Sequence, residues 1–129
     1  MSISNQWENE ILDHIFNNAA APAVATAWIS LHDGAAGDTG ANEVSGGTHS
    51  YARKAGAFGN AAGGAVSNTA SLTWTNMPAC TVQSVGVWIS STATASANFI
   101  WGGALTTNKV VGAGDTFKIT VGNLDVTLA

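Results

Sequence analysis

The sequence has few charged residues, and most of them are acidic. Only 9% of its 129 residues are charged, and four basic residues stand against eight acidic ones, giving a net charge of −4. Proteins that bind nucleic acid need clustered Lys and Arg side chains to neutralise phosphates. The one adjacent basic pair is Arg53 and Lys54, which is too small to form a basic patch. The composition therefore argues against a nucleic-acid partner.

The low proportion of charged residues is also relevant to whether the surface faces water or other subunits. Surfaces of soluble domains usually carry roughly 25–35% charged residues. Here Ala, Gly, Ser and Thr supply almost half of the chain. Two interpretations stay open: a β surface rich in Thr and Ser that faces water, or a surface largely covered by neighbouring subunits of an assembly.

Cysteine and long apolar runs are also scarce. Cys80 is the single cysteine, so no disulfide can form within the chain, and we expect a small buried hydrophobe there. No apolar run approaches the 18 or so residues of a membrane-spanning helix, so we expect no membrane partner. The first residues lack the basic and apolar regions of a signal peptide, which predicts folding in a cytoplasm.

One helix is expected, over residues 2–17, within an N-terminal segment 1–18. Trp7, Ile11 and Ile15 recur every four residues, and Leu12 and Phe16 widen this apolar stripe. A helix this short is marginal alone, so it must dock, either on its own sheet or on a neighbouring subunit. The residues expected to cap or end it are Ser2 or Ser4 at the start and Asn17, Asn18 and Pro22 at the end.

The remainder, residues 24–129, is predicted to be mainly β within one domain spanning 1–129. Alternating apolar and polar residues, as in Phe117–Ile119, indicate strands with one buried face. The nearly continuous apolar run 85–89 is typical of a strand covered on both faces. The pattern predicts an antiparallel β-sandwich or Greek-key barrel of about seven strands. The expected strands are 25–32, 51–54, 72–76, 82–90, 99–101, 117–121 and 124–128.

Residues 33–48 form a long loop that gathers most of the polar candidates for chemistry. Carboxylates there could bind a hard cation, and histidines with a carboxylate could bind zinc, but the spacing fits no established metal site. Ordinary solvated turn residues explain them better. No Gly-x-Ser-x-Gly motif and no convergent acid–base pair is visible. We therefore expect no enzyme activity, no metal and no cofactor. The candidates weighed were His32, Asp33, Asp38, Glu43 and His49.

Five tryptophans are the other candidates for function. We expect Trp7, Trp74 and Trp101 in the core. Trp28 and Trp88 lie opposite the core positions of their strands, which favours a contact between sheets or subunits. A sugar-stacking site at these two tryptophans is the alternative.

Several segments together resemble a family of small structural proteins from tailed-bacteriophage virions, often labelled tail fibre or minor structural proteins. The most specific element is the Gly-Ala-Leu-Thr…Lys…Gly-Asp-Thr pattern within 103–116. Residues 33–38 and 92–96 depart from the family's loops, which affects partner choice more than fold. The matching segments are 8–16 (ENEILDHIF), 27–31 (AWISL), 43–47 (EVSGG), 51–53 (YAR), 85–89 (VGVWI), 103–116 (GALTTNKVVGAGDT) and 122–128 (GNLDVTL).

The resemblance implies a virion protein assembled in the host bacterial cytoplasm. A fibre shaft needs a long or repetitive chain and no repeat is visible, so we expect a capsid decoration (cement) protein, often a homotrimer, that binds the major capsid protein or other virion proteins. The alternatives are a tail-fibre or tail-tip component and, from another class, a module that binds host glycans. The loops 33–48 and 56–64 would contact neighbours. The interface candidates are Trp7, Ile11, Ile15, Trp28, Asp38, Glu43, Phe58 and Trp88.

Overall fold

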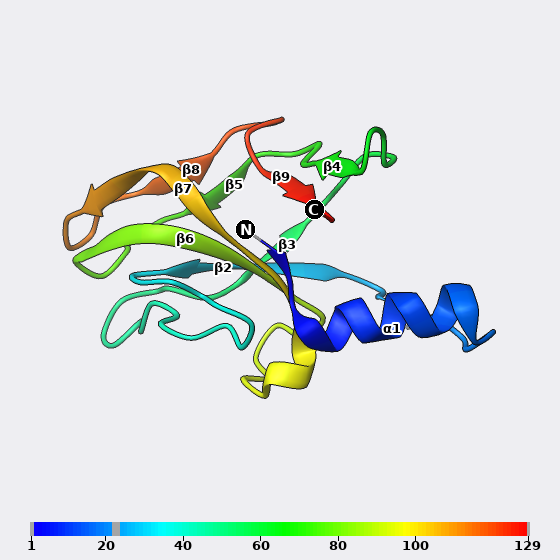
Figure 1. The fold of residues 1–129 in the computed structure, drawn as a ribbon. Helices are drawn as coiled ribbons and strands as arrows, with labels where there is room; N and C mark the ends of the chain where they lie inside the picture. Colours follow the sequence, from blue (N-terminus) through cyan, green and yellow to red (C-terminus); the bar gives the residue numbers. More distant parts are fainter. Residues whose placement is uncertain (1, 22–23, 129) are drawn as a thin grey trace.

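The structure, a computed structural model, describes residues 2–21 and 24–128. Within these residues the fold is mainly β with one α-helix at the N-terminal side, as expected from the sequence (Figure 1). The expected helix stop at Pro22 lies outside the described residues. In chain order the elements are β1 (Ser2–Ile3), α1 (Asn5–Phe16), β2 (Ala27–His32), β3 (Lys54–Gly56), β4 (Ala65–Ser67), β5 (Leu72–Trp74), β6 (Cys80–Trp88), the 3-10 turn η1 (Ser96–Asn98), β7 (Phe99–Val111), β8 (Phe117–Ile119) and β9 (Asp125–Thr127).

The strands form two antiparallel layers. The larger layer is a five-stranded sheet in the order β1-β7-β6-β2-β3, and the two-stranded ladders β4-β9 and β5-β8 lie over one of its faces (Figure 1). Six of the seven expected strands are present with shifted ends. The expected strand 51–54 overlaps the observed strand β3 only at Lys54. The short strands β1 and β4 were not predicted, because two or three residues are too few to show a period of two.

The main core lies between the two layers. Ile29 and Leu31 of β2 point into it, as do Val85 and Val87 of β6, and all four are almost completely buried. β8 contributes Phe117, which packs against Trp74 with 5.9 Å between ring centroids. In these strands, side chains two residues apart therefore face the same core, as a period of two requires.

The opposite face of the large sheet is covered by the loop 33–48. On this side Trp88 and Phe99 pack edge to face, 4.8 Å between ring centroids, beside Ala36 of the loop. Trp28 packs against the same cluster and is only half-buried. β6 is consequently buried on both faces, as its continuous apolar run indicated.

The start of the helix is a correction to the prediction. Ser2 and Ile3 form β1, which pairs with Trp101 and Gly102 of β7, so helical structure begins only at Asn5. Ser4 is the residue before the helix, but its hydroxyl makes no cap. Instead, Ser4 Oγ donates a hydrogen bond of 2.7 Å to the carbonyl of Phe99. The N-terminus is thus held by a strand 95 residues later in the chain.

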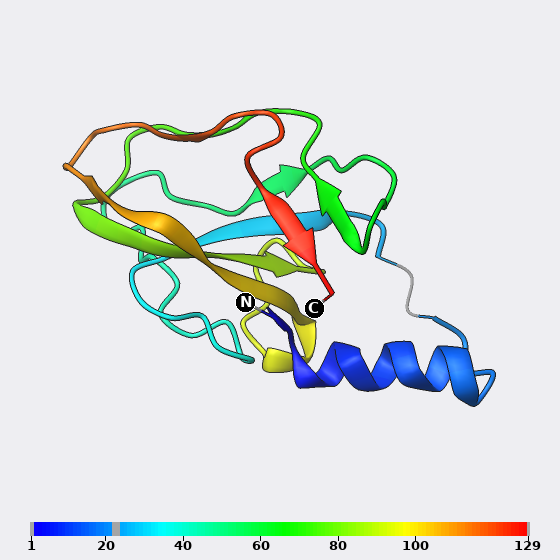
Figure 2. The same ribbon diagram turned by 45° about the horizontal axis from the view of Figure 1, so that its top comes forward.

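From this junction α1 projects away from the sheets, as two views show (Figures 1 and 2). Trp7 is buried with 9% of its surface exposed, and Ile11 packs partly against the core. Beyond Ile11 the helix has little contact with the rest of the molecule, since all of its following residues are exposed. The helix therefore docks on its own sheet only through its first half.

Candidate interaction surfaces

Loop 33–48 is fixed by an ion pair that is largely shielded from water. Arg53 Nη2 lies 2.7 Å from Glu43 Oε2, and Arg53 Nε donates to Glu43 Oε1 at 2.9 Å. This two-pronged contact matches the planar guanidinium to the carboxylate. Arg53 Nη1 also donates to the carbonyls of Ser90 and Ala93, so a single side chain joins two loops. Glu43, an interface candidate, is thus engaged within its own chain.

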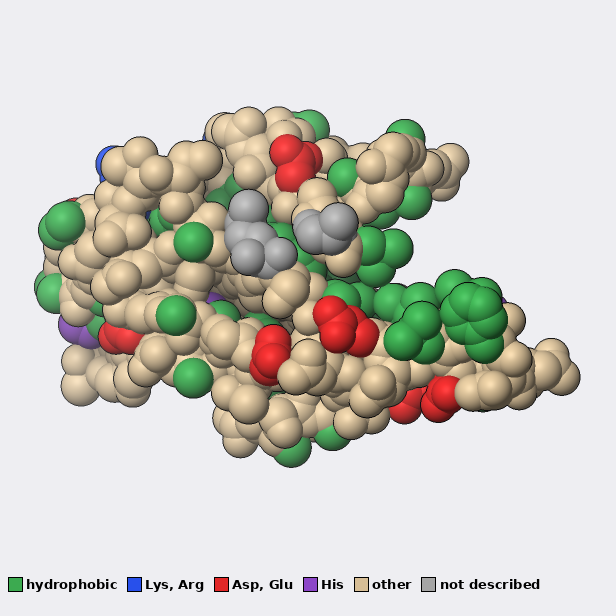
Figure 3. Space-filling view, in the orientation of Figure 1, with side chains coloured by type: hydrophobic (Ala, Val, Ile, Leu, Met, Phe, Trp, Pro, Cys, Tyr) green, Lys and Arg blue, Asp and Glu red, His purple; other side chains and the backbone are tan. Residues whose placement is uncertain are grey.

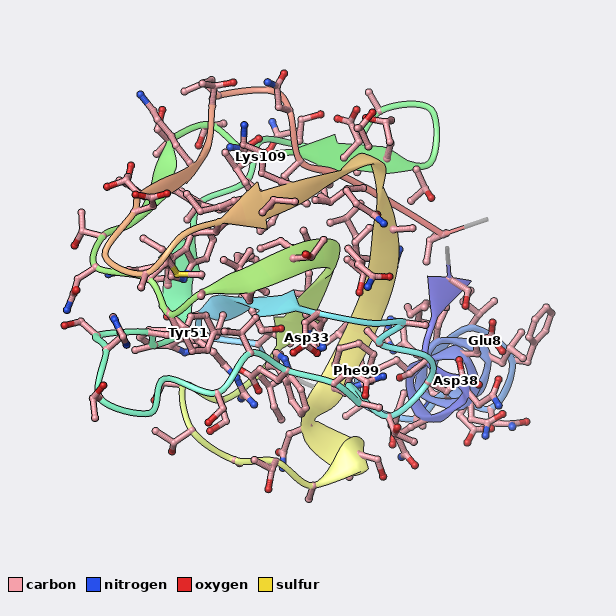
Figure 4. The ribbon with its side chains drawn as sticks, turned by 90° about the vertical axis from the view of Figure 1, so that its left-hand side faces the viewer. Glu8, Asp33, Asp38, Tyr51, Phe99 and Lys109 are labelled. Atoms are coloured by element: carbon pink, nitrogen blue, oxygen red, sulfur yellow. The ribbon has the colours of Figure 1, made fainter. Side chains whose placement is uncertain are left out.

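Tyr51 adds a second bond to the same carboxylate. Its hydroxyl donates to Glu43 Oε1 at 3.0 Å and accepts the backbone N–H of Leu31, also at 3.0 Å. Burial, and then the negative charge of Glu43, raises the pKa of Tyr51. Tyr51 therefore stays protonated and keeps its donor, which ties loop residue Glu43 to strand β2. Glu43, Tyr51 and Arg53 belong to segments that match the family. Their side chains meet at the Glu43 carboxylate (Tyr51 is labelled in Figure 4).

Trp88 lies directly beneath this ion pair. The guanidinium carbon of Arg53 lies 3.8 Å from the centroid of the Trp88 ring, a cation–π geometry. Trp88 is only 1% exposed. Trp88, an interface candidate, is therefore not exposed at the surface of this chain, because the loop that follows β2 folds back over it. A buried ring also offers no face for a sugar to stack on.

Ser30 and His32 form a hydrogen-bonded chain below Trp88 that sequence reasoning missed. Trp88 Nε1 donates to Ser30 Oγ at 2.8 Å, and Ser30 Oγ lies 2.6 Å from His32 Nε2. His32 Nδ1 lies 2.6 Å from the carbonyl of Ala41, which can only accept, so Nδ1 carries the proton and Nε2 accepts from Ser30. Burial lowers the pKa of His32, which keeps it neutral. Both side chains are completely buried, so their polar atoms serve to hold the loop.

Loop 33–48 still presents some polar residues to solvent. Asp38 and Asp33 are exposed, and His49 is partly exposed just after the loop. Among residues 2–21 and 24–128, no group of three His, Cys, Asp or Glu side chains is placed to hold a metal ion. Figure 4 shows Asp38 on the loop side of the large sheet, whereas Lys109 lies on the side of the smaller layer. These exposed loop residues remain candidates for contacts with other proteins.

The distal half of α1 presents an unpartnered apolar face. Leu12, Ile15 and Phe16 are 52%, 62% and 75% exposed, which is high for residues of this size. Their spacing of three and four places them on one side of the helix. Figure 3 shows hydrophobic side chains gathered where the helix faces a notch between itself and the β layers. We call Leu12, Ile15 and Phe16 the apolar face of α1.

A groove of about 400 Å³ runs between β7 and the segment from β8 to β9. Val85 and Trp101 of the main core contribute to its lining. One wall is formed at an irregularity of β7, where the register shifts between Val82 and Ser84 of β6. Lys109 and Lys118, both exposed, lie at the groove. We call this feature the β7–β8 groove; sequence reasoning missed it because the bulge that opens it leaves no pattern.

The eight interface candidates therefore separate into different environments. Ile15 is largely exposed on the projecting helix, and Asp38 is exposed in the loop. Trp7 and Trp88 are buried, as are the expected core residues Trp74 and Trp101. Half-buried positions are Ile11, Trp28, Glu43 and Phe58, the last of which packs against the main core. The structure does not bring the eight together into one site.

Comparisons with known proteins identify the family. No helix within the described residues is long and apolar enough to cross a membrane. No curated protein matches the chain. A family model described as "Podophage GP4 fiber I protein gp80" matches residues 2–127, which is nearly the whole chain. The resemblance to phage virion structural proteins is thereby confirmed, and the chain belongs to the family of the podophage GP4 fiber I protein gp80.

Proposed function

We propose that this virion protein is a non-catalytic component of a podophage fibre. The observation that carries the proposal is the family match over residues 2–127, whose description names a fibre protein. The fold is consistent with a structural subunit. Its layered β body is stabilised by the Glu43–Arg53 salt bridge and carries a helix that projects from one end. The Ser30–His32 pair is completely buried, so no substrate can reach it.

The fibre assignment replaces capsid decoration as the preferred role. The decoration hypothesis rested on the absence of a repeat, because a shaft needs a long or repetitive chain. A fibre also needs modules at its base, its joints and its tip, and a β body of this kind fits those places. The family description favours this role, and it implies contacts with other virion proteins.

We further propose that the chain assembles as a homotrimer in the host cytoplasm before it joins the virion. The support is the low charge of the chain and the apolar face of α1, which exposes three large side chains. Contiguous exposed apolar side chains commonly mark protein–protein contacts.

Immunogold labelling of purified particles tests the location. Antibodies against the exposed loop 33–48 are expected to label the tail or its fibres. Uniform labelling of the head would contradict the fibre role and restore the decoration hypothesis. If intact particles contain the protein by mass spectrometry but show no label, a second antibody against residues 56–64 is used. Head labelling by either antibody would overturn the proposal.

A further inference from the structure

We infer that the apolar face of α1 in one copy binds the β7–β8 groove of a second copy. This inference deepens the proposed self-association and rests on it. It commits to a head-to-tail interface, in which each copy offers one helix and one groove.

The helix needs a partner for physical reasons. An isolated helix of twelve residues is marginal in water, and most helical stability in proteins comes from packing of an apolar face. Here only the first half of α1 is packed, through Trp7 and Ile11. The apolar face formed by Leu12, Ile15 and Phe16 lies beyond that support and is exposed.

The groove has a suitable size and a partly apolar lining. Its volume of about 400 Å³ lies within the range of pockets that enclose small molecules, about 300–1,000 Å³, so it can accept two or three apolar side chains. Side chains of the main core reach its floor, among them Trp101 and Phe117. An apolar helix anchored in such a groove follows a common mode of peptide recognition.

Charge favours the same pairing. α1 carries Glu8, Glu10 and Asp13 and no Lys or Arg. Two of the four basic residues of the chain, Lys109 and Lys118, lie at the groove. One carboxylate also lies at the groove, that of Asp125, which accepts a hydrogen bond from Ser67 Oγ. An acidic helix and a groove with two exposed lysines attract each other and orient the encounter.

The helix cannot occupy the groove of its own copy. α1 leaves the body beside the start of β7 and points away from β8, as Figures 1 and 2 agree. The contact must therefore form between copies. Because helix and groove are different surfaces, the interface is heterologous, and a closing rotation generates a ring such as a trimer.

Two variants of the full chain test each side of the interface. Phe16→Asp places a charge in the apolar face of α1, and Thr107→Glu places an acidic side chain at the groove, where Thr107 is exposed. Each should weaken self-association at least about tenfold in analytical ultracentrifugation, as expected for a buried anchor. Val110→Asp is the control, since Val110 is 76% exposed and lies outside both surfaces. It should leave self-association unchanged, and circular dichroism should show all three variants folded.

Mixing the two variants gives the sharpest result. The Phe16→Asp chain keeps an intact groove and the Thr107→Glu chain keeps an intact helix, so one productive interface can form. The mixture should yield a 1:1 dimer and no larger species. One outcome would overturn the inference: the Thr107→Glu chain assembles like the wild type, whereas the Phe16→Asp chain does not. That result would show that the helices of different copies pack on one another.

Cysteine cross-linking gives an independent readout. On a Cys80→Ser background, a mixture of Phe16→Cys and Thr107→Cys chains should form a disulfide between the two. Links only between two Phe16→Cys chains would overturn the inference. A wild-type chain that stays monomeric at high concentration would overturn it as well. In that case gold labelling of fibres would still support the fibre role, so the two failures are distinguishable.

Discussion

Gly40 lies directly against the ring of Trp88. A Cβ atom at position 40 would lie 2.2 Å from Trp88 Cζ2 and 2.9 Å from Phe99 Cδ2. The backbone of Gly40 also has φ of +72°, a conformation that side chains disfavour. This contact explains how a glycine-rich loop can cover an aromatic cluster. Because Gly40 has no side chain, the loop backbone packs directly against the rings.

Gly40→Ala is therefore expected to destabilise the fold. The clash and the strained φ together should lower the free energy of unfolding by about 2–5 kcal/mol. Urea unfolding followed by tryptophan fluorescence measures the change. Gly37→Ala is the matched control, because Gly37 has φ of +58° and a Cβ atom added there would meet nothing within 4 Å. It should cost only about 1 kcal/mol, and an equal loss for both variants would contradict the close contact.

Loss of the carboxylate at Glu43 should leave Arg53 buried without its ionic partner. Glu43→Gln is expected to lower the free energy of unfolding by about 3 kcal/mol, the range seen when one partner of a buried pair is removed. Thermal and urea unfolding measure it. Asp38→Asn removes an exposed carboxylate from the same loop and should change stability by no more than about 0.5 kcal/mol.

A double-mutant cycle extends this prediction. Arg53→Met together with Glu43→Gln should cost less than the sum of the single changes, since neither charge is then left unpaired. Additive losses would show that the two side chains do not act as a pair.

Stability should fall in mild acid because of His32. Burial holds the pKa of His32 below its ordinary value of 6.5, so the unfolded chain binds a proton more readily than the folded chain. The contribution is fully present above pH 6.5 and is lost as the pH falls toward the lowered value. In the range between the two values the slope approaches about 1.4 kcal/mol per pH unit.

Urea unfolding at a series of pH values from 7.5 to 5 tests this dependence. His14→Gln, which changes an exposed histidine of α1, should retain it. His32→Gln should be less stable at neutral pH and should lose the part of the slope that belongs to this group. A slope unchanged in His32→Gln would assign the acid sensitivity to other residues.

Trp7 should decide whether α1 stays attached to the body. Trp7→Ala removes the main buried contact of the helix and is expected to cost about 3–5 kcal/mol. Limited proteolysis should then cleave the 4–17 region faster than in the wild type. Asn9→Ala changes an exposed residue of the same helix and should leave the cleavage rate unchanged. Equal cleavage of both variants would mean that Trp7 does not hold the helix.

The strands and the core face were predictable because their signal is local. Phe117 and Ile119 alternate with Lys118, and a period of two places alternate side chains on opposite faces whatever the rest of the chain does. The φ of +83° at Gly114 and the hydrogen bond from Gly112 N–H to Asp115 Oδ2 form the tight turn between β7 and β8.

The surroundings of Trp88 and of α1 were not predictable in the same way. Trp88 lies on the face of β6 opposite Val87. Whether that face is exposed to solvent or buried depends on loop 33–48, which lies about forty or more residues earlier in the sequence. The apolar stripe of α1 was visible, but a stripe does not say what covers it: Trp7 meets the sheet, whereas Ile15 meets solvent. Non-local contacts of this kind leave no period in the sequence.

The pairing of β1 with β7 has a kinetic consequence. The bond from Ser4 to Phe99 closes a loop across most of the chain, and such distant contacts form late in folding. During synthesis α1 emerges well before β7, the strand that fixes its direction. α1 therefore takes its final orientation only after β7 has been made and has paired with β1.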